Sequence, residues 1–186
     1  MRRILIAVAI LLLISAVSIG WLHHHTSRFD YIIGQAAARN GLDFHLVKAL
    51  IYEESWFRPE ILGAAGELGL MQITAAAASD FSTYKKFPPI GDSQRMEPEL
   101  NVEIGCWYLK RSIDRYKDSP YPVLFALLRY NAGETRSDSW LKLALSNPRQ
   151  DGVSEEDHCL SVVDFPKTRA YARRILARAQ NHKYWF

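Results

Sequence analysis

The chain divides into one long apolar run and a longer part with helical periodicity. Residues 4–22 are apolar apart from two serines and one glycine, and Arg2-Arg3 precedes them. These nineteen residues exceed a usual signal-peptide core and match the roughly 20 that cross a hydrocarbon layer. Further along, no segment alternates as a strand does, and apolar residues recur with helical spacing. The expected order of segments is a signal anchor or signal peptide (1–22), a linker (23–28) and one mainly helical globular domain (29–186).

Capping residues and prolines set the boundaries of the expected helices. Asn40-Gly41 ends the first helix, Asp43 and Thr74 are suited to cap the next two, and prolines open later ones. The expected helices cover 29–39, the segment that follows Asp43, 75–80, 98–117, 122–130, 139–146 and the segment that begins at Asp164 or Pro166. We expect the polar residues 147–163 to be irregular.

The helix that follows Asp43 directs one glutamate toward the protein interior. Its apolar face consists of Leu46, Val47, Leu50 and Ile51. Glu54 falls within about 10° of the centre of this face, whereas Glu53 falls about 90° away from it. Burial of a carboxyl group raises its pKa, so Glu54 is suited to donate a proton near neutral pH. Pro59 predicts that the helix ends shortly after Glu54, where a cleft can reach it. Geometry alone also allows a solvated carboxylate or a pair with Arg58.

Four motifs narrow these alternatives. They are Glu54-Ser55 with Gly63, Gly66 and Gly69-Leu70-Met71-Gln72; Asn101 with Gly105 and Tyr108-Leu109; Tyr130-Asn131-Ala132-Gly133; and Thr168-Arg169-Ala170-Tyr171. In this order, the motifs resemble the soluble lytic transglycosylase domain, a lysozyme-like family that cuts bacterial peptidoglycan. The resemblance extends over roughly residues 29–179. It implies a single domain of the α+β lysozyme superfamily.

The resemblance also implies a mechanism with one catalytic residue, Glu54. In this family the glutamate first protonates the glycosidic oxygen between MurNAc and GlcNAc. It then deprotonates the C6 hydroxyl of the muramoyl residue, which closes a 1,6-anhydro ring without water. Ordinary glycosidases need two carboxyl groups, and no second one stands at a motif position here.

The resemblance further implies a set of substrate-binding residues. The set is Ser55, Gly69, Leu70, Met71, Gln72, Tyr130, Asn131 and Tyr171. Ser55 would help to hold the catalytic carboxyl group, and the hydroxyl group of Tyr171 would approach it. Ordinary structural roles remain open for several members: Leu70 and Met71 suit a core, and Asn131 suits a helix end.

At four places the sequence departs from the family pattern. The usual proline after the Gly-Leu-Met-Gln motif is Thr74, and the usual Ser-Pro of the loop is Gly63-Ala64. Arg129 replaces a small residue, and Lys167 replaces a glutamate. These changes put the contacts around the sugar cleft in question rather than the identity of Glu54.

Composition excludes several other classes of protein. Hydrophobic residues make up 48% of the chain and charged residues 23%, with a net charge of +3. No basic patch with interleaved aromatic residues suggests nucleic-acid binding. The histidines 23–25 suit a solvated spacer, and no motif predicts a metal or cofactor. Cys106 and Cys159 either form a disulfide in an oxidising compartment or remain two buried thiols.

The apolar run and the resemblance together predict location and partners. Arg2-Arg3 favours an N-terminus that stays inside, with the domain in the periplasm and residues 4–22 in the inner membrane. Residues 16–18 form a passable cleavage site, so secretion after cleavage is the alternative. The expected partners are peptidoglycan strands and a secretion, pilus or phage assembly. Two rival functions stay open: a non-catalytic peptidoglycan-binding or assembly factor, and a hydrolytic lysozyme.

Overall fold

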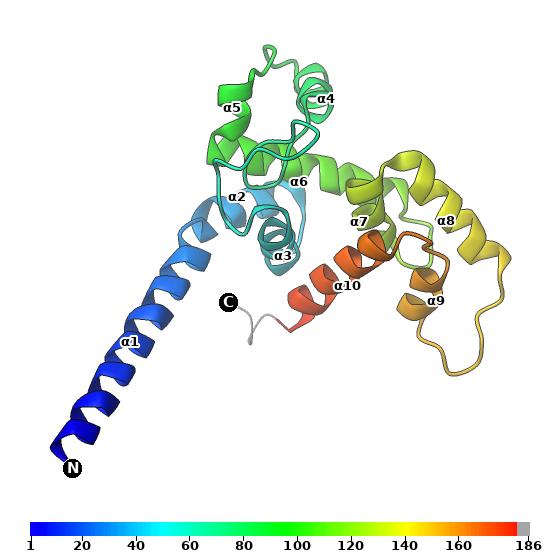
Figure 1. The fold of residues 1–186 in the computed structure, drawn as a ribbon. Coiled ribbons are helices and arrows are strands. Elements are labelled where there is room, and N and C mark those ends of the chain that lie inside the picture. Colours follow the sequence, from blue (N-terminus) through cyan, green and yellow to red (C-terminus); the bar gives the residue numbers. More distant parts are fainter. Residues whose placement is uncertain (182–186) are drawn as a thin grey trace.

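The computed structural model describes residues 1–181, and this part of the chain is mainly helical (Figure 1). Its helices are α1 (Arg2–Ser27), α2 (Asp30–Asn40), α3 (Phe44–Ser55), α4 (Ala75–Lys85), α5 (Asp92–Met96), α6 (Pro98–Arg115), α7 (Pro122–Ala132), α8 (Glu134–Ser146), α9 (Glu155–Ser161) and α10 (Pro166–Gln180). Extended backbone in residues 1–181 is limited to isolated bridges that join Leu68 to Leu62 and to Ile73. The expected mainly helical domain is confirmed.

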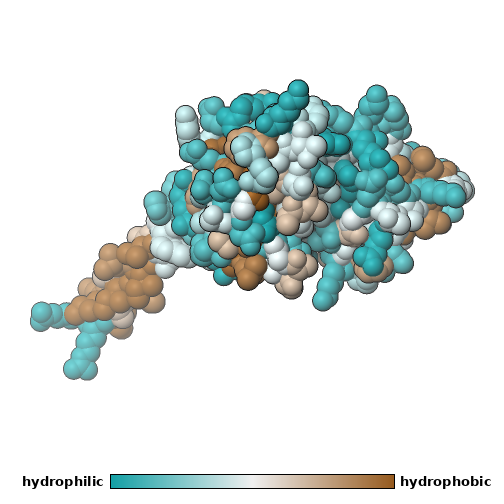
Figure 2. Space-filling view, turned by 90° about the horizontal axis from the view of Figure 1, so that it is seen from above, coloured by the Kyte–Doolittle hydropathy of each residue, from teal (hydrophilic) through white to brown (hydrophobic). Residues whose placement is uncertain are grey.

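Helix α1 projects away from the globular body (Figure 1). Its apolar side chains are exposed, and they form the hydrophobic rod that Figure 2 shows with a hydrophilic tip. The helical stretch Arg2–Asn40, which joins α1 to α2, contains an 18-residue window of mean hydropathy 2.7 with none of it buried. Its length and composition are sufficient to cross a membrane. The expected N-terminal apolar helix is therefore present.

The expected linker at 23–28 is not irregular, because α1 continues to Ser27. His25, which we expected to be part of a solvated spacer, is only 9% exposed. The polar triplet itself gives no sign of this burial, because the aromatic residues that cover this side of α1 lie far along the chain, after α3. The spacer interpretation of this histidine is wrong.

Local signals set most helix ends as expected. Asp43 accepts a hydrogen bond from the backbone N–H of Leu46 at 2.9 Å, and Thr74 accepts one from Ala77 at 3.0 Å. Gly41 ends α2 in the left-handed conformation, with φ of 64°. Glycine adopts this conformation without a Cβ penalty, which explains the sharp turn into α3.

The structure corrects the expected irregular segment 147–163, because α9 lies within it. Ser154 accepts a hydrogen bond from the backbone N–H of Asp157 at 3.0 Å, and three acidic residues occupy the first turn. Both features stabilise a helix N-terminus. Leu160 is fully buried on the inner side of α9. Helix α8 also begins at Glu134, earlier than expected.

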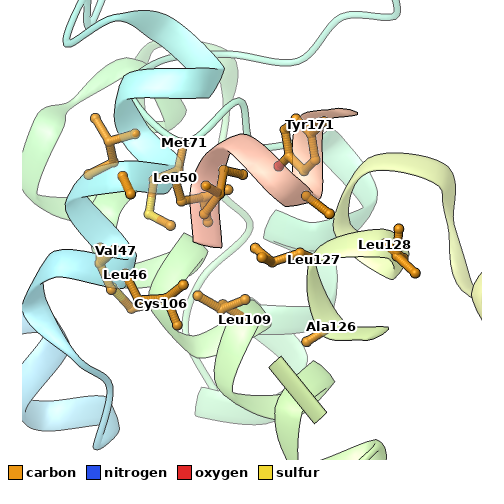
Figure 3. Close-up of a cluster of buried hydrophobic side chains, with 14 of the residues drawn as sticks. Leu46, Val47, Leu50, Met71, Cys106, Leu109, Ala126, Leu127, Leu128 and Tyr171 are labelled. Atoms are coloured by element: carbon orange, nitrogen blue, oxygen red, sulfur yellow. The ribbon is translucent and has the colours of Figure 1, made fainter. Parts of the chain in front are cut away.

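The core places the end of α3 beside α10. Helix α3 packs against α10 and α2, while α6 packs against α7 and α2. Figure 3 shows the cluster of buried side chains that α3 shares with α6, α7, α10 and the loop after α3. Its labelled members are Leu46, Val47, Leu50, Met71, Cys106, Leu109, Ala126, Leu127, Leu128 and Tyr171.

The two cysteines are free thiols in this core. Cys106 of α6 and Cys159 of α9 are both fully buried and are not paired with each other. Burial raises the pKa of both thiols above the usual range. Of the two alternatives, the structure therefore shows buried apolar cysteines rather than a disulfide.

Candidate active site

Glu54 lies in the last turn of α3, where the helix ends as expected. The helix stops at Ser55, and Trp56 follows in the left-handed conformation with φ of 50°. Glu54 is half-buried, as the apolar face of its helix predicts. A carboxyl group in this position has lost much of its hydration but remains accessible from one side.

One direct partner of Glu54 is Tyr171 of α10, whose hydroxyl group donates a hydrogen bond to Oε1. Burial raises the pKa of Glu54 from 4.5 to about 7, while the Tyr171 hydrogen bond acts in the opposite direction. The carboxylates of Glu53 and Glu67 raise this pKa further. Glu54 is therefore mainly protonated below about pH 7 and mainly ionised above it.

Glu53 has different partners from Glu54, although the two residues are adjacent. Its Oε1 accepts a hydrogen bond from Nε of Arg174 at 2.9 Å, and its Oε2 lies 3.6 Å from Nη1 of Arg178. Tyr171, Arg174 and Arg178 are spaced by three and four residues, so they share one face of α10. Along this face α10 attaches to α3, and the attachment places the Tyr171 hydroxyl group on Glu54.

Tyr130 lies close to Glu54 and fixes the neighbouring loop. Its hydroxyl group donates to the backbone oxygen of Met71 at 2.8 Å. Burial raises the pKa of Tyr130 well above the usual range, and the charge of Glu54 adds to this effect. Tyr130 is therefore a neutral hydrogen-bond donor near neutral pH.

A buried asparagine holds the loop between α3 and α4 in shape. Asn101 of α6 is fully buried. Its Oδ1 accepts from the backbone N–H of Met71 at 2.7 Å, and its Nδ2 donates to Leu68 and Arg95 backbone oxygens at 2.7 and 2.6 Å. Ser55 adds a hydrogen bond to the backbone oxygen of Leu70 at 2.8 Å. The loop is thus fastened to α3 and α6 at several backbone positions.

Two glycines allow the close contacts of this loop. Gly69 has φ of 79°, and a Cβ there would lie 2.4 Å from Nδ2 of Asn101. A Cβ on Gly105 of α6 would lie 2.3 Å from Sδ of Met71. Because both distances are far below van der Waals contact, a larger residue at either position would displace the loop.

The structure divides the predicted substrate-binding residues into two groups. Tyr130 and Tyr171 lie beside Glu54, whereas Ser55, Leu70 and Met71 are buried behind it. The other three have mixed settings. Gly69 is buried and Gln72 is half-buried, with Nε2 donating to the Gly69 oxygen at 2.9 Å. Asn131 is exposed and accepts from Oγ1 of Thr168 at 2.7 Å. Their roles toward a sugar remain predictions.

Sequence reasoning did not identify several contributors to the site. Asn101 and Thr168 lie in two of the four motifs, and their motif positions are the signal that could identify them. Glu53 and Glu67 had no such signal, because their influence depends on tertiary contacts. Among residues 1–181, no group of three His, Cys, Asp or Glu side chains is placed to hold a metal ion.

Arg129, one of the departures from the family pattern, supports the site from behind. It donates to Oγ of Ser112 at 2.8 Å and to Glu134 at 2.6 Å. Its guanidinium group lies 5.2 Å from the Tyr108 ring, which in turn packs edge-on against Tyr130 at 5.6 Å. The large cation is thus accommodated in a row of aromatic and polar contacts next to Tyr130.

This fold and site define a class: a lysozyme-like helical domain built around one half-buried glutamate. Its fold resembles the 70 kDa soluble lytic transglycosylase of Escherichia coli, with a TM-score of 0.73, 22% identity, and coverage of 84% of this chain and 24% of that chain. It also resembles an inactive glutamate-to-glutamine mutant of lytic transglycosylase Slt from Pseudomonas aeruginosa, with a TM-score of 0.68, 24% identity, and coverage of 80% and 23%.

The model of the Transglycosylase SLT domain family matches residues 31–151. The chain therefore belongs to the Transglycosylase SLT domain family. Helix α10, which carries Tyr171, lies beyond the matched residues.

Curated relatives carry related names. Membrane-bound lytic murein transglycosylase F of Desulfosudis oleivorans is 36% identical over 57% of this chain and 22% of its own length. Soluble lytic murein transglycosylase of Salmonella typhimurium is 32% identical over 69% of this chain and 19% of its own length. Peptidoglycan transglycosylase gp16 of Escherichia phage T7 is 29% identical over 83% of this chain and 10% of its own length. The chain thus spans about a fifth or less of the length of these relatives.

Proposed function

We propose that this protein is a peptidoglycan lytic transglycosylase that cleaves the β-1,4 bond between MurNAc and GlcNAc. The observation that carries the proposal is the half-buried Glu54 whose pKa is raised to about 7 and whose Oε1 accepts a hydrogen bond from Tyr171. Membership of the Transglycosylase SLT domain family and the names of the curated relatives support it.

In the proposed reaction, one carboxyl group serves twice. Protonated Glu54 donates its proton to the glycosidic oxygen as the bond to C1 breaks. The Tyr171 hydroxyl group stabilises the carboxylate that results, because hydrogen bonds to a charged acceptor are stronger than neutral ones. The same carboxylate then takes the proton of the C6 hydroxyl group, whose oxygen bonds to C1. The product is a 1,6-anhydro end, and no water is consumed.

The other site residues have proposed roles around this centre. Tyr130 keeps the loop of Gly69 and Gln72 in place beside Glu54, since its hydroxyl group is bonded to the loop backbone. Asn131 is exposed and adjacent to this tyrosine, so it is available to a sugar hydroxyl or acetamido group. Ser55 supports the site through the backbone rather than by touching the substrate.

A hydrolytic lysozyme is the second candidate, because Glu67 supplies a possible second carboxylate. Glu67 is close enough to raise the pKa of Glu54, and its Oε2 accepts a hydrogen bond from the backbone N–H of Ala65 at 2.9 Å. A hydrolase would use such a group to activate water. The products separate the two functions, since only the transglycosylase leaves 1,6-anhydro ends.

The proposed location is the periplasmic side of the inner membrane, with α1 as the anchor. The exposed apolar surface of α1 and the membrane-bound relatives support this location. A role beside a secretion, pilus or phage assembly is also part of the proposal. The phage T7 relative supports it, because its name combines peptidoglycan transglycosylase activity with a phage origin.

The decisive experiment compares the full chain with Glu54→Gln on purified sacculi. Glutamine keeps the size of the side chain but cannot give or take a proton, so release of 1,6-anhydro muropeptides should fall about 10²- to 10⁴-fold. Glu60→Gln, an exposed exchange in the same segment, is the matched control and should retain activity. Reducing ends instead of anhydro ends would establish the hydrolase. Binding of sacculi without any cleavage by the wild type would establish the non-catalytic binding factor.

A further inference from the structure

The last turns of α1 pack against the loop that directly follows Glu54 and α3. The His25 ring stacks on Trp21 at 5.1 Å and lies 4.4 Å from the Trp56 ring, and the two tryptophans are 5.9 Å apart. His25 Nε2 also lies 2.8 Å from the backbone oxygen of Trp56. Trp56 is two residues from Glu54 along the chain. The apolar helix therefore contacts the segment that begins two residues after Glu54.

This contact restricts α1 in more than one direction. The guanidinium group of Arg28 donates to the backbone oxygen of Phe57, next to the His25 contact. Thr26, the next residue after His25, is only 4% exposed. Helix α1 ends at Ser27 and α2 begins at Asp30, which leaves two residues between them. A segment so short and so covered does not act as a flexible tether.

The length of α1 fixes where this contact lies relative to a bilayer. If residues 4–22 fill the hydrocarbon layer, His25 lies about 5 Å beyond its edge, at a rise of about 1.5 Å per residue. The headgroup region on each side of a bilayer is about 5–7 Å thick. Trp21 then lies at the edge of the hydrocarbon layer, next to the interface that tryptophan prefers. Trp56 lies at headgroup level, and Glu54, two residues before Trp56, lies within about 7 Å of Trp56.

We propose that α1 is a rigid pedestal that holds Glu54 at the membrane surface, so that the enzyme cuts glycan presented at that surface. The inference rests on the proposed function and names its substrate class: glycan strands that a lipid anchor keeps against the same bilayer. Strands of a wall layer farther from the membrane are outside the reach of Glu54. A flexible linker would not impose this limit, since about 20 Gly/Ser residues span roughly 25 Å.

The first test locates the domain without any need for activity. A spin label is placed at Glu60→Cys, in the loop after Trp56, and at Ser146→Cys, at the end of α8. The native thiols are fully buried, so the introduced cysteine is the one that reacts. The full chain is reconstituted in phosphatidylethanolamine–phosphatidylglycerol vesicles that contain a nickel-chelating lipid. We expect the headgroup nickel to relax the label at residue 60 and to leave the label at residue 146 largely unaffected. Equal relaxation of both labels would overturn the pedestal.

The second test measures reach with three variants in the same vesicles. One variant carries a 20-residue Gly/Ser insertion after Ser27, one carries His25→Ala, and the control carries His24→Ala, which alters an exposed neighbour. The substrates are un-crosslinked glycan with a polyprenyl anchor in the vesicle membrane, and isolated sacculi. The readout is the release of 1,6-anhydro muropeptides.

Wild type and His24→Ala should cut the anchored glycan at least about tenfold faster than sacculi, as a high effective concentration at one surface predicts. The insertion should abolish this preference, and His25→Ala should reduce it. If wild type and the insertion variant cut sacculi equally well, the pedestal does not limit reach and the proposal fails. If wild-type protein in detergent cuts no glycan at all, the proposed enzymatic function fails, whereas the label positions still decide the pedestal. Isolation of the mature chain without residues 1–18 would also overturn the proposal.

Discussion

Replacing Glu54 by glutamine should stabilise the protein while it removes activity. Burial raises the pKa of Glu54 from 4.5 to about 7. The folded state therefore binds this proton more tightly than the unfolded state does. The stability that this tighter proton binding contributes is fully present below about pH 4.5 and is lost as the pH rises through about 7.

The pKa difference gives the magnitude of this effect. The interval from 4.5 to about 7 corresponds to about 3 kcal/mol, because one pKa unit is worth about 1.4 kcal/mol. Above pH 7, the wild-type protein carries a charged carboxylate in a half-buried position, whereas an amide needs no such ionisation. Glu54→Gln should thus be more stable by up to about 3 kcal/mol at pH 8, and nearly equal to wild type at pH 4. The amide oxygen can still accept the Tyr171 hydrogen bond.

The assay is urea unfolding of the full chain in a non-ionic detergent at several pH values between 4 and 8.5. Tryptophan fluorescence reports the unfolded fraction. Glu60→Gln serves as the control, because an exposed glutamate should shift stability by no more than about 0.5 kcal/mol. The informative quantity is the pH dependence of the difference between variant and wild type. If Glu54→Gln has the same or lower stability than wild type at pH 8, Glu54 ionises there without penalty, and the reasoning about its burial is wrong.

Three further predictions use the same contacts. The kcat/KM of the wild type should fall above about pH 7, with its midpoint near the pKa of Glu54, as pH–rate profiles on soluble glycan would show. Tyr171→Phe removes the hydrogen bond that lowers this pKa, so the midpoint should move up by about one pH unit. Glu67→Gln removes a charge that raises this pKa without touching α10, so the midpoint should move down, and two shifts in the same direction would refute the assignment. Asn101→Ala should lower the free energy of unfolding by about 2–4 kcal/mol in urea titrations, because it leaves buried backbone groups unpaired.

Local sequence signals were sufficient for the helix that carries Glu54. The caps at Asp43 and Thr74 and the stop at Gly41 depend on residues within about one helical turn, and the apolar face of α3 depends on residues within two to three turns. The position of Glu54 at a helix end follows from the same local information. Its chemical role required the ordered motifs as well, because an isolated glutamate at a helix end is an ordinary feature.

The parts that sequence reasoning missed depend on distant contacts. Arg174 contacts Glu53 across 121 residues of sequence, and no periodic pattern reports such a pair. The polar triplet 23–25 predicts a solvated His25, yet Trp56 covers this histidine. Helix α9 was missed for a different reason: its cap at Ser154 is local, but the surrounding segment is too polar to show an apolar face.

The proton affinity of Glu54 is accordingly a property of the tertiary structure. Burial of Glu54 raises its pKa, and so do the charges of Glu53 and Glu67, while the hydrogen bond from Tyr171 lowers it. Tyr171 reaches Glu54 because the arginines on the same face of α10 bind Glu53. The residue adjacent to Glu54 thus raises its pKa by charge and also holds the helix that lowers it. In the proposed reaction this group first gives and then regains a proton, and a pKa held near 7 by opposing influences suits both steps.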